Sequence, residues 1–122
     1  MIKHVNFVTV PVTDQKRALE FYTRRLGLTV FTDQPMGPDG QRWIELKIPG
    51  AQTKVVLFTT DENRDQIGKS ASFTFNVDDL DKTHAELREL GVEFVHPPKK
   101  EPWGAYAVLL DSEGNKLLIS QG

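Results

Sequence analysis

The sequence predicts an α+β protein made of two tandem modules, each running strand, helix, strand, strand, strand. The same order of apolar runs, helical stripes and turn residues occurs in both halves of the 122-residue chain, offset by about 65 positions. The two predicted helices are also alike in length, since Asp14 to Gly27 spans 13 positions and Asp79 to Gly91 spans 12. A repeated supersecondary unit indicates copies of one structure. We therefore expect a single domain, with module one at 1–60, a linker at 61–70 and module two at 71–122.

The first module opens with the apolar run Val5–Val12, which is typical of a strand. Asp14 is a candidate N-cap, because a short carboxylate there accepts a hydrogen bond from a free backbone N–H. Gly27 ends the predicted helix, whose buried stripe is Ala18, Phe21, Tyr22 and Leu26. The remaining strands are expected at Leu28–Thr32, Arg42–Ile48 and Thr53–Thr60, with a long loop rich in Pro and Gly at Asp33–Gln41.

The second module repeats this pattern. Its first strand is expected at Ser72–Val77, and Asp78 or Asp79 begins a helix that Gly91 ends. The buried stripe of this helix is Leu80, Thr83, Leu87 and Leu90. The later strands are expected at Val92–His96, closed by Pro97 and Pro98, and at Ala105–Asp111 and Lys116–Ser120, which are joined by the turn Ser112-Glu113-Gly114-Asn115.

Composition excludes several classes of protein. Lys and Arg number 15 against 17 Asp and Glu, and the resulting net charge of −2 argues against nucleic acid as a partner. The chain has no cysteine, which excludes a disulfide framework, a thiolate metal site and a cysteine nucleophile. Apolar runs such as Ala107–Leu110 and Leu117–Ile119 are far shorter than the ~20 residues that cross a bilayer. The N-terminus enters a strand pattern without a signal peptide, so we expect the cytoplasm.

Three segments carry a family resemblance. They are Val12-Thr13-Asp14 followed by Ala18, Phe21-Tyr22 and Leu26-Gly27; Phe75–Leu80 followed by Leu90–Val92 and Pro97; and Pro102–Gly104 followed by Asp111–Asn115. Together they resemble the vicinal oxygen chelate superfamily, which includes glyoxalase I, extradiol dioxygenases, and fosfomycin and bleomycin resistance proteins. The resemblance implies a curved mixed sheet around an open-sided cavity, with the helices outside, and a homodimer.

Strand alternation assigns side chains to the two faces of that implied sheet. In the strand at 42–48, Trp43, Glu45 and Lys47 are expected to face the cavity, while Ile44, Leu46 and Ile48 pack on a helix. In the strand at 72–77, Ser72, Thr74 and Asn76 are expected to face the cavity, while Phe73, Phe75 and Val77 pack on the helices.

Metal-dependent relatives carry one ligand, usually His or Glu, on each of four cavity strands. The resemblance carries these positions to Phe7, Leu57, Ser72 and Leu118. Phe and Leu have no donor atom, and a Ser hydroxyl alone is a poor ligand. We therefore expect no metal ion and no other cofactor, which argues against glyoxalase and dioxygenase chemistry because that chemistry needs the ion.

Without the metal, the same positions predict a protein that binds an apolar or aromatic small molecule, as drug-sequestering relatives do. Phe7, Leu57 and Leu118 form an apolar floor, and Ser72, Thr74 and Asn76 add neutral hydrogen-bonding groups. Trp43, Trp103 and Tyr106 supply flat walls with polar tips. Glu45 adds a carboxylate on the cavity face.

Two alternatives remain open. In the first, Glu45 is the acid or base of a metal-independent lyase, isomerase or hydrolase, with a weaker version in which His4, Glu45 and Glu101 recruit a metal. In the second, the chain is a structural or interaction module whose cavity is filled.

Overall fold

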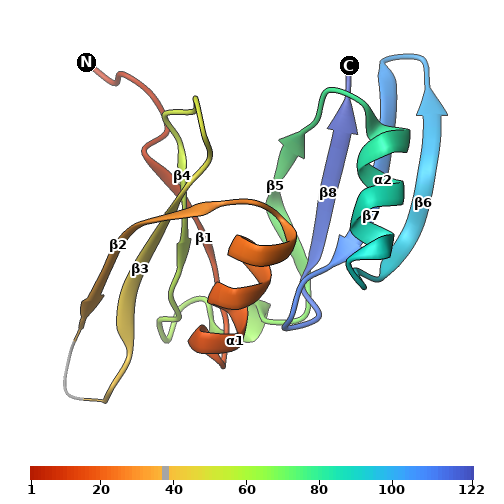
Figure 1. Ribbon diagram of the computed structural model, residues 1–122. Helices are drawn as coiled ribbons and strands as arrows, with labels where there is room; N and C mark the ends of the chain where they lie inside the picture. The colour runs from red at the N-terminus through yellow and green to blue at the C-terminus, as the bar shows by residue number, and fades with distance from the viewer. Residues whose placement is uncertain (37–38) are drawn as a thin grey trace. The chain divides into compact units, whose positions relative to one another are not determined.

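The computed structural model describes residues 1–36 and 39–122. The chain divides into two compact units, Met1–Ile67 and Gly68–Gly122. Each unit has the predicted order of one strand, one helix and three strands, and its strands form one four-stranded mixed sheet (Figure 1). The α+β class and the two tandem βαβββ modules are therefore confirmed.

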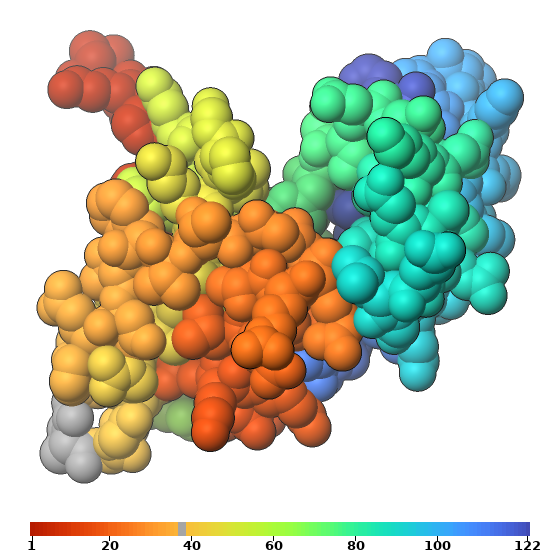
Figure 2. Space-filling model, in the orientation of Figure 1, coloured from red at the N-terminus to blue at the C-terminus, as the bar shows by residue number. Residues whose placement is uncertain are grey.

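The first unit packs one helix on a sheet of strand order β1-β4-β3-β2. Strands β1 and β4 are parallel, and the other neighbours are antiparallel. Its elements are β1 (Phe7–Val10), α1 (Gln15–Glu20), the π-helical segment η1 (Phe21–Arg25), β2 (Thr29–Pro35), β3 (Arg42–Lys47), β4 (Lys54–Leu57) and the 3₁₀ turn η2 (Arg64–Gln66). The core between helix and sheet includes Val10, Ala18, Tyr22, Ile44 and Leu57, each at most 1% exposed. The N-terminal residues project from this unit (Figure 2).

The first helix begins at its predicted cap and ends as a π-helix. Asp14 Oδ1 accepts the Arg17 N–H at 3.0 Å. From Phe21 the helix widens, and the Leu26 N–H donates to the Phe21 carbonyl, five residues back, at 3.3 Å. The first helix region is one residue longer than the second, since Asp14 to Gly27 spans 13 positions and Asp79 to Gly91 spans 12. The wider turn accommodates this extra residue. A π-turn of this kind arises where a helix takes up one inserted residue.

The second unit has the same arrangement, with strand order β5-β8-β7-β6 and the parallel pair β5–β8. Its elements are β5 (Ser70–Asn76), α2 (Leu80–Glu89), β6 (Phe94–Glu101), β7 (Gly104–Leu110) and β8 (Lys116–Gln121). Asp79 is the N-cap of α2, and its Oδ1 accepts the Lys82 N–H at 3.1 Å. Leu80, Leu87, Leu109 and Leu117 are buried between helix and sheet.

Several expected boundaries are wrong, and the edges of the sheets explain most of them. Strand β6 does not close at Pro97 and Pro98 but runs through both to Glu101. It is an edge strand with register shifts on both sides of His96, so the missing proline N–H groups disrupt no central ladder. Strand β2 is also an edge strand and extends to Pro35, which shortens the expected loop at 33–41; residues 37–38 of that loop lie outside the described residues. Leu90, expected in the buried stripe, is 49% exposed.

The predicted turn between β7 and β8 is held by a buried carboxylate. Asp111 Oδ1 accepts the backbone N–H groups of Glu113 at 2.8 Å and Asn115 at 2.9 Å. Asp111 Oδ2 accepts the Asn115 side-chain amide at 3.0 Å, and Asn115 Oδ1 accepts the Gly68 N–H at 2.7 Å. Asp111 and Asn115 therefore fix both the turn and the entry of the chain into the second unit.

None of the helices in the described residues has the length and apolar character that crossing a membrane requires.

Candidate functional site

Each sheet has one face that its own helix covers and one that this helix leaves open. In the first sheet, Leu57 pairs with Ile44 and with Val10, so these three side chains share the helix-covered face. Val56 pairs with Glu45 and with Thr9, which lie on the opposite face. We call this opposite face the first open face; its side chains are Phe7, Thr9, Thr32, Gln34, Trp43, Glu45, Lys47, Lys54 and Val56.

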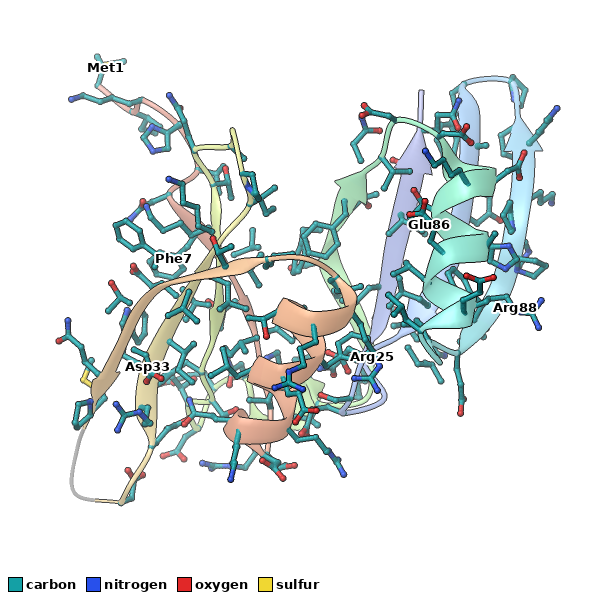
Figure 3. The ribbon with its side chains drawn as sticks, in the orientation of Figure 1. Met1, Phe7, Arg25, Asp33, Glu86 and Arg88 are labelled. Carbon is teal, nitrogen blue, oxygen red and sulfur yellow. The ribbon has the colours of Figure 1, made fainter. Side chains whose placement is uncertain are left out.

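The rings of Phe7 and Phe58 both contact the Trp43 ring. The Phe7 ring contacts Trp43 edge to face, with centroids 5.6 Å apart, and the Phe58 ring lies at 5.1 Å on a tilted plane. Trp43 Nε1–H donates to Glu45 Oε1 at 3.2 Å, which orients the carboxylate beside the rings. Phe7 lies at the start of β1, where the N-terminal segment enters the sheet (Figure 3), and is 36% exposed. The result is an apolar surface with one oriented acceptor.

A cation lies beside this surface. Lys54 pairs with Phe7 across β1 and β4, and its Nζ lies 4.7 Å from the centroid of the Phe31 ring. Such a cation–π contact holds the ammonium group in place at a partly exposed site. Sequence reasoning missed Phe31, Lys54 and Phe58, because a bulge at Phe31 and the end of β4 interrupt the alternation on which it relied.

In the second sheet, the predicted alternation is observed. Ser72, Thr74 and Asn76 are exposed, and the intervening Phe73 and Phe75 are partly buried, with their rings 5.2 Å apart. Thr74 pairs with Leu118, which pairs with Val108, and Asn76 pairs with Ser120, which pairs with Tyr106. All of these share the face opposite Ile119 and Leu117, which we call the second open face. Trp103, 58% exposed, stacks on Tyr106 with centroids 6.0 Å apart.

The expectation that Leu57 lies on the same face as Trp43 is wrong. Leu57 is fully buried on the helix-covered face, next to Ile44. The residue of β4 that corresponds to Leu118 is Val56, since Val56 pairs with Thr9 just as Leu118 pairs with Thr74. The motif alignment was displaced by one residue, and in a strand one residue reverses the face.

The metal ion of the superfamily does not fit this donor set. After the correction, the four ligand positions hold Phe7, Val56, Ser72 and Leu118, and the Ser72 hydroxyl is the single donor among their side chains. Within residues 1–36 and 39–122, no group of three or more His, Asp or Glu side chains is arranged to hold a metal ion. We therefore assign no reaction step to a metal ion.

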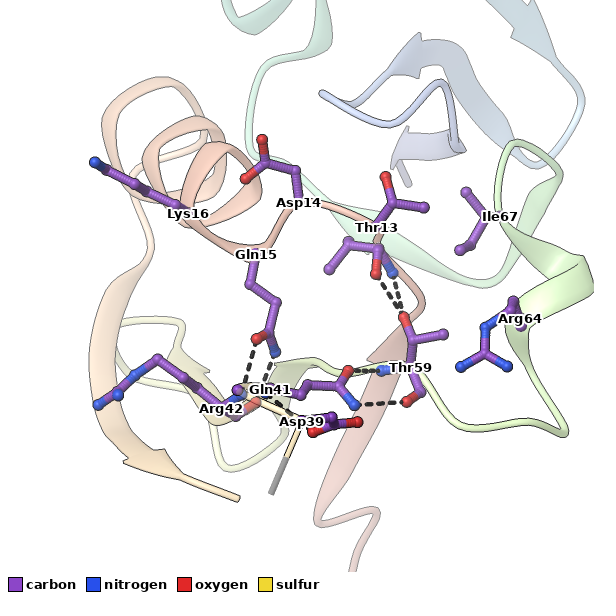
Figure 4. A pocket seen from close by; sticks show the side chains of 12 residues that line it. Thr13, Asp14, Gln15, Lys16, Asp39, Gln41, Arg42, Thr59, Arg64 and Ile67 are labelled. Atoms are coloured by element: carbon purple, nitrogen blue, oxygen red, sulfur yellow. Dashed lines mark hydrogen bonds between the residues drawn. The ribbon is translucent and has the colours of Figure 1, made fainter. Parts of the chain in front are cut away.

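The first unit also contains a cavity of about 700 Å³ beside the start of α1 (Figure 4). Much of its polar wall is engaged in holding the fold together. Thr59 Oγ1 bonds both the N–H and the carbonyl of Val12, at 2.8 and 2.6 Å. The Gln15 amide bonds the Arg42 backbone at 2.6 and 2.9 Å, and the Gln41 amide bonds the Thr59 backbone at 2.8 and 3.0 Å. Phe7, Trp43 and Glu45 do not line this cavity, so it is separate from the aromatic surface.

These features define a class of protein: two βαβββ modules that present three apolar side chains and one hydroxyl at the positions where metal-dependent relatives hold an ion. The chain belongs to the glyoxalase/bleomycin resistance protein/dioxygenase superfamily, whose family model matches residues 2–119.

Relatives of known structure cover the whole chain. A superfamily member from Sphaerobacter thermophilus is 30% identical, with a TM-score of 0.87, over 99% of this chain and 98% of its own. The antibiotic binding protein TnmS3 from a Streptomyces species is 35% identical, also with a TM-score of 0.87, over 98% of this chain and 96% of its own. Among curated proteins, YetH of Bacillus subtilis is 32% identical over 99% of this chain and all of its own length.

Proposed function

We propose that the protein binds an apolar or aromatic small molecule, without a metal ion, on its open sheet faces. The observation that carries this proposal is the ring cluster on the first open face, where Trp43 contacts Phe7 at 5.6 Å and Phe58 at 5.1 Å. Small-molecule sites combine such apolar surface with a few polar groups that fix orientation. Glu45, held by the Trp43 N–H at 3.2 Å, is the polar group of this face.

The second open face supports the same role with different chemistry. Trp103 and Tyr106 offer flat ring surface, and Ser72, Thr74 and Asn76 offer neutral hydrogen bonds. Leu118 supplies apolar area where relatives place metal ligands, whereas Val56, which takes the place of Leu57 on the first face, is fully buried. The 35% identity to an antibiotic binding protein is consistent with a binding role.

The donor set supports metal independence, because the side chains of Phe7, Val56 and Leu118 have no atom that could bind an ion. The proposal also includes a homodimer, as the resemblance implies. From the charge balance, the short apolar runs and the N-terminal pattern, it places the protein in the cytoplasm with a small molecule as partner rather than nucleic acid or a membrane.

Tryptophan fluorescence tests the proposal, because the chain has two tryptophans and each can be isolated. Trp103→Phe leaves Trp43 as the single reporter. We expect saturable quenching by 2-methoxynaphthalene, an uncharged aromatic probe. At roughly 0.4–0.6 kcal/mol per non-hydrogen atom, a probe of this size should bind with a Kd on the order of 0.01–1 mM.

The variant Trp43→Ala, measured by calorimetric titration because it removes the fluorescent reporter, should weaken binding about tenfold, by loss of ring contact worth ~1–2 kcal/mol. Val30→Ala is the matched control, since Val30 is 50% exposed but pairs with Leu46 on the other face, and its affinity should stay within about twofold of wild type. No saturable binding, or binding indifferent to Trp43→Ala, contradicts the assignment of the first open face.

One observation favours a second candidate, a metal-independent lyase, isomerase or hydrolase. The carboxylate of Glu45 lies beside an apolar surface and is oriented by the Trp43 N–H at 3.2 Å, as a general base would be. Glu45→Gln keeps the shape of the side chain and an acceptor for that N–H. If the protein turns over a ligand, this variant should abolish turnover while retaining binding. Turnover that survives the change removes Glu45 from the mechanism.

A further inference from the structure

Three rings form a stack on the second unit, and one of them has no part in the proposed function so far. The His96 ring stacks on Tyr106 with centroids 5.2 Å apart and planes 21° apart. Tyr106 in turn stacks on Trp103 at 6.0 Å and 23°. We call His96, Tyr106 and Trp103 the ring stack.

Strand pairing puts this stack on the second open face. His96 of β6 pairs with Val108 of β7, which pairs with Leu118 of β8. Tyr106 lies two residues before Val108 on the same strand, and therefore on the same face. The three nearly parallel rings thus lie beside the row of Thr74, Asn76 and Ser120.

The hydrogen bond of His96 fixes which ring nitrogen carries the proton. His96 Nδ1 lies 2.7 Å from the carbonyl oxygen of Pro97. A carbonyl oxygen can only accept, so Nδ1 must donate, and in the neutral ring Nε2 then keeps its lone pair. Within the described residues, no hydrogen bond engages His96 Nε2. The stack therefore carries a fixed acceptor at one end and the exposed indole of Trp103, 58% accessible, at the other.

Charge on this face favours an uncharged ligand. Lys99 pairs with Tyr106 across β6 and β7, and its Nζ lies 3.4 Å from Glu101 Oε1, so the ammonium group already has a carboxylate partner. The other polar groups beside the stack are the hydroxyls of Thr74 and Ser120 and the amide of Asn76, while Lys116 lies on the same face at the other end of β8. A flat, neutral ring system would pack against the edges of indole and phenol, and a donor at its rim would satisfy Nε2.

We propose that His96 accepts a hydrogen bond from an O–H or N–H at the rim of an uncharged planar aromatic ligand that packs across the edges of the Tyr106 and Trp103 rings. The inference rests on the proposed function and names its ligand class. His96 is then a specificity-determining residue, since it distinguishes ligands with a rim donor from equally flat ligands without one.

Two probes that differ in the donor alone test the inference. 2-Naphthol carries an O–H, and 2-methoxynaphthalene replaces that hydrogen by a methyl group. Calorimetric titration of the wild-type protein should show 2-naphthol binding roughly three- to tenfold tighter, the effect of one neutral hydrogen bond. In His96→Phe, which keeps a ring to stack on Tyr106, the ratio of the two affinities should fall to about one.

His84→Phe is the matched control. His84 is the other histidine of this unit; it lies on α2, with its ring edge against Phe94 at 4.5 Å, away from the second open face. This variant should keep the wild-type ratio. A ratio that persists in His96→Phe overturns the inference while leaving the proposed function intact. Failure of both probes to bind the wild-type protein overturns both.

The proton position supplies a readout independent of binding. Long-range proton–nitrogen correlations of the histidine rings should show His96 protonated at Nδ1 and unprotonated at Nε2, with the Nε2 resonance moving on addition of 2-naphthol. A His96 ring protonated at Nε2 alone would have no acceptor at that nitrogen and overturns the inference without reference to any ligand.

Discussion

The turn between β7 and β8 offers the sharpest test of how the second unit is held together. The perturbation is an exchange of Asp111 and Asn115. Asp111 accepts hydrogen bonds at 2.8, 2.9 and 3.0 Å and is 6% exposed. Each bond to a charged acceptor contributes about 1.5–3 kcal/mol net, but bonds to one carboxylate are not additive. We therefore expect Asp111→Ala to lower the free energy of unfolding by about 3–5 kcal/mol.

Asp111→Asn separates charge from geometry. Its side-chain oxygen can still accept from the backbone of Glu113 and Asn115, but its amide then opposes the amide of Asn115, donor against donor. We expect a loss of about 1–3 kcal/mol. The double variant Asp111→Asn/Asn115→Asp restores a donor–acceptor pair, and its carboxylate can still accept the Gly68 N–H that Asn115 holds at 2.7 Å. It should recover to within about 1 kcal/mol of wild type.

Urea unfolding followed by circular dichroism measures all four proteins, with equal m-values as the check that the unfolding transition itself is unchanged. A double variant no more stable than Asp111→Asn would refute the reasoning, because it would mean that the pairing of these two side chains contributes nothing beyond the backbone bonds.

Two further predictions concern the backbone and the missing metal. Gly104→Ala should lower the free energy of unfolding, measured by thermal unfolding, by about 2–4 kcal/mol, because the φ of Gly104 is +148° and a Cβ there would overlap the carbonyl oxygen of Gln121. Gly50→Ala is the control, since Gly50 is also at positive φ but in open space, and it should lose only about 1 kcal/mol. An equal loss in both variants would show that crowding at Gly104 is unimportant. Elemental mass spectrometry of tag-free protein incubated with Ni²⁺, Zn²⁺, Fe²⁺ and Mn²⁺ should find far less than one ion per chain. EDTA should leave the melting temperature within about 1 °C of its value without the chelator. One tightly held ion per chain would mean that a donor set exists outside the four ligand positions.

The sequence predicted the modules because their signals are local. Asp14 and Asp79 cap helices where expected, and Gly27 and Gly91 follow the helix ends with φ of +79° and +86°. Pro97 and Pro98 misled the prediction, because whether a proline ends a strand depends on whether that strand lies at a sheet edge, which the sequence does not reveal. The proline N–H groups that β6 lacks would have mattered only in a central strand.

The candidate site was predicted less well, because faces depend on register. Trp43 and Glu45 were assigned to one face correctly from alternation, whereas Leu57 was assigned through a motif and was displaced by one residue. From the sequence, His96 was assigned no role, because the signal for it lies in two contacts, one with the Tyr106 ring on the neighbouring strand and one with the Pro97 carbonyl. Neither contact follows from composition or spacing.

The π-helical segment at Phe21–Arg25 records how two copies of one module can grow apart in length without losing their sheets. After this segment the two modules make equivalent hydrogen bonds again. In the first module the Leu28 N–H donates to the Tyr22 carbonyl, six residues back, and in the second the Val92 N–H donates to the Leu87 carbonyl, five residues back, both at 3.0 Å. Had the same insertion fallen within a strand, every later side chain of that strand would have moved to the opposite face of the sheet. Ancestry or design comparisons between the halves should therefore place one gap inside the helix, and removing one residue there would give the two helices equal length.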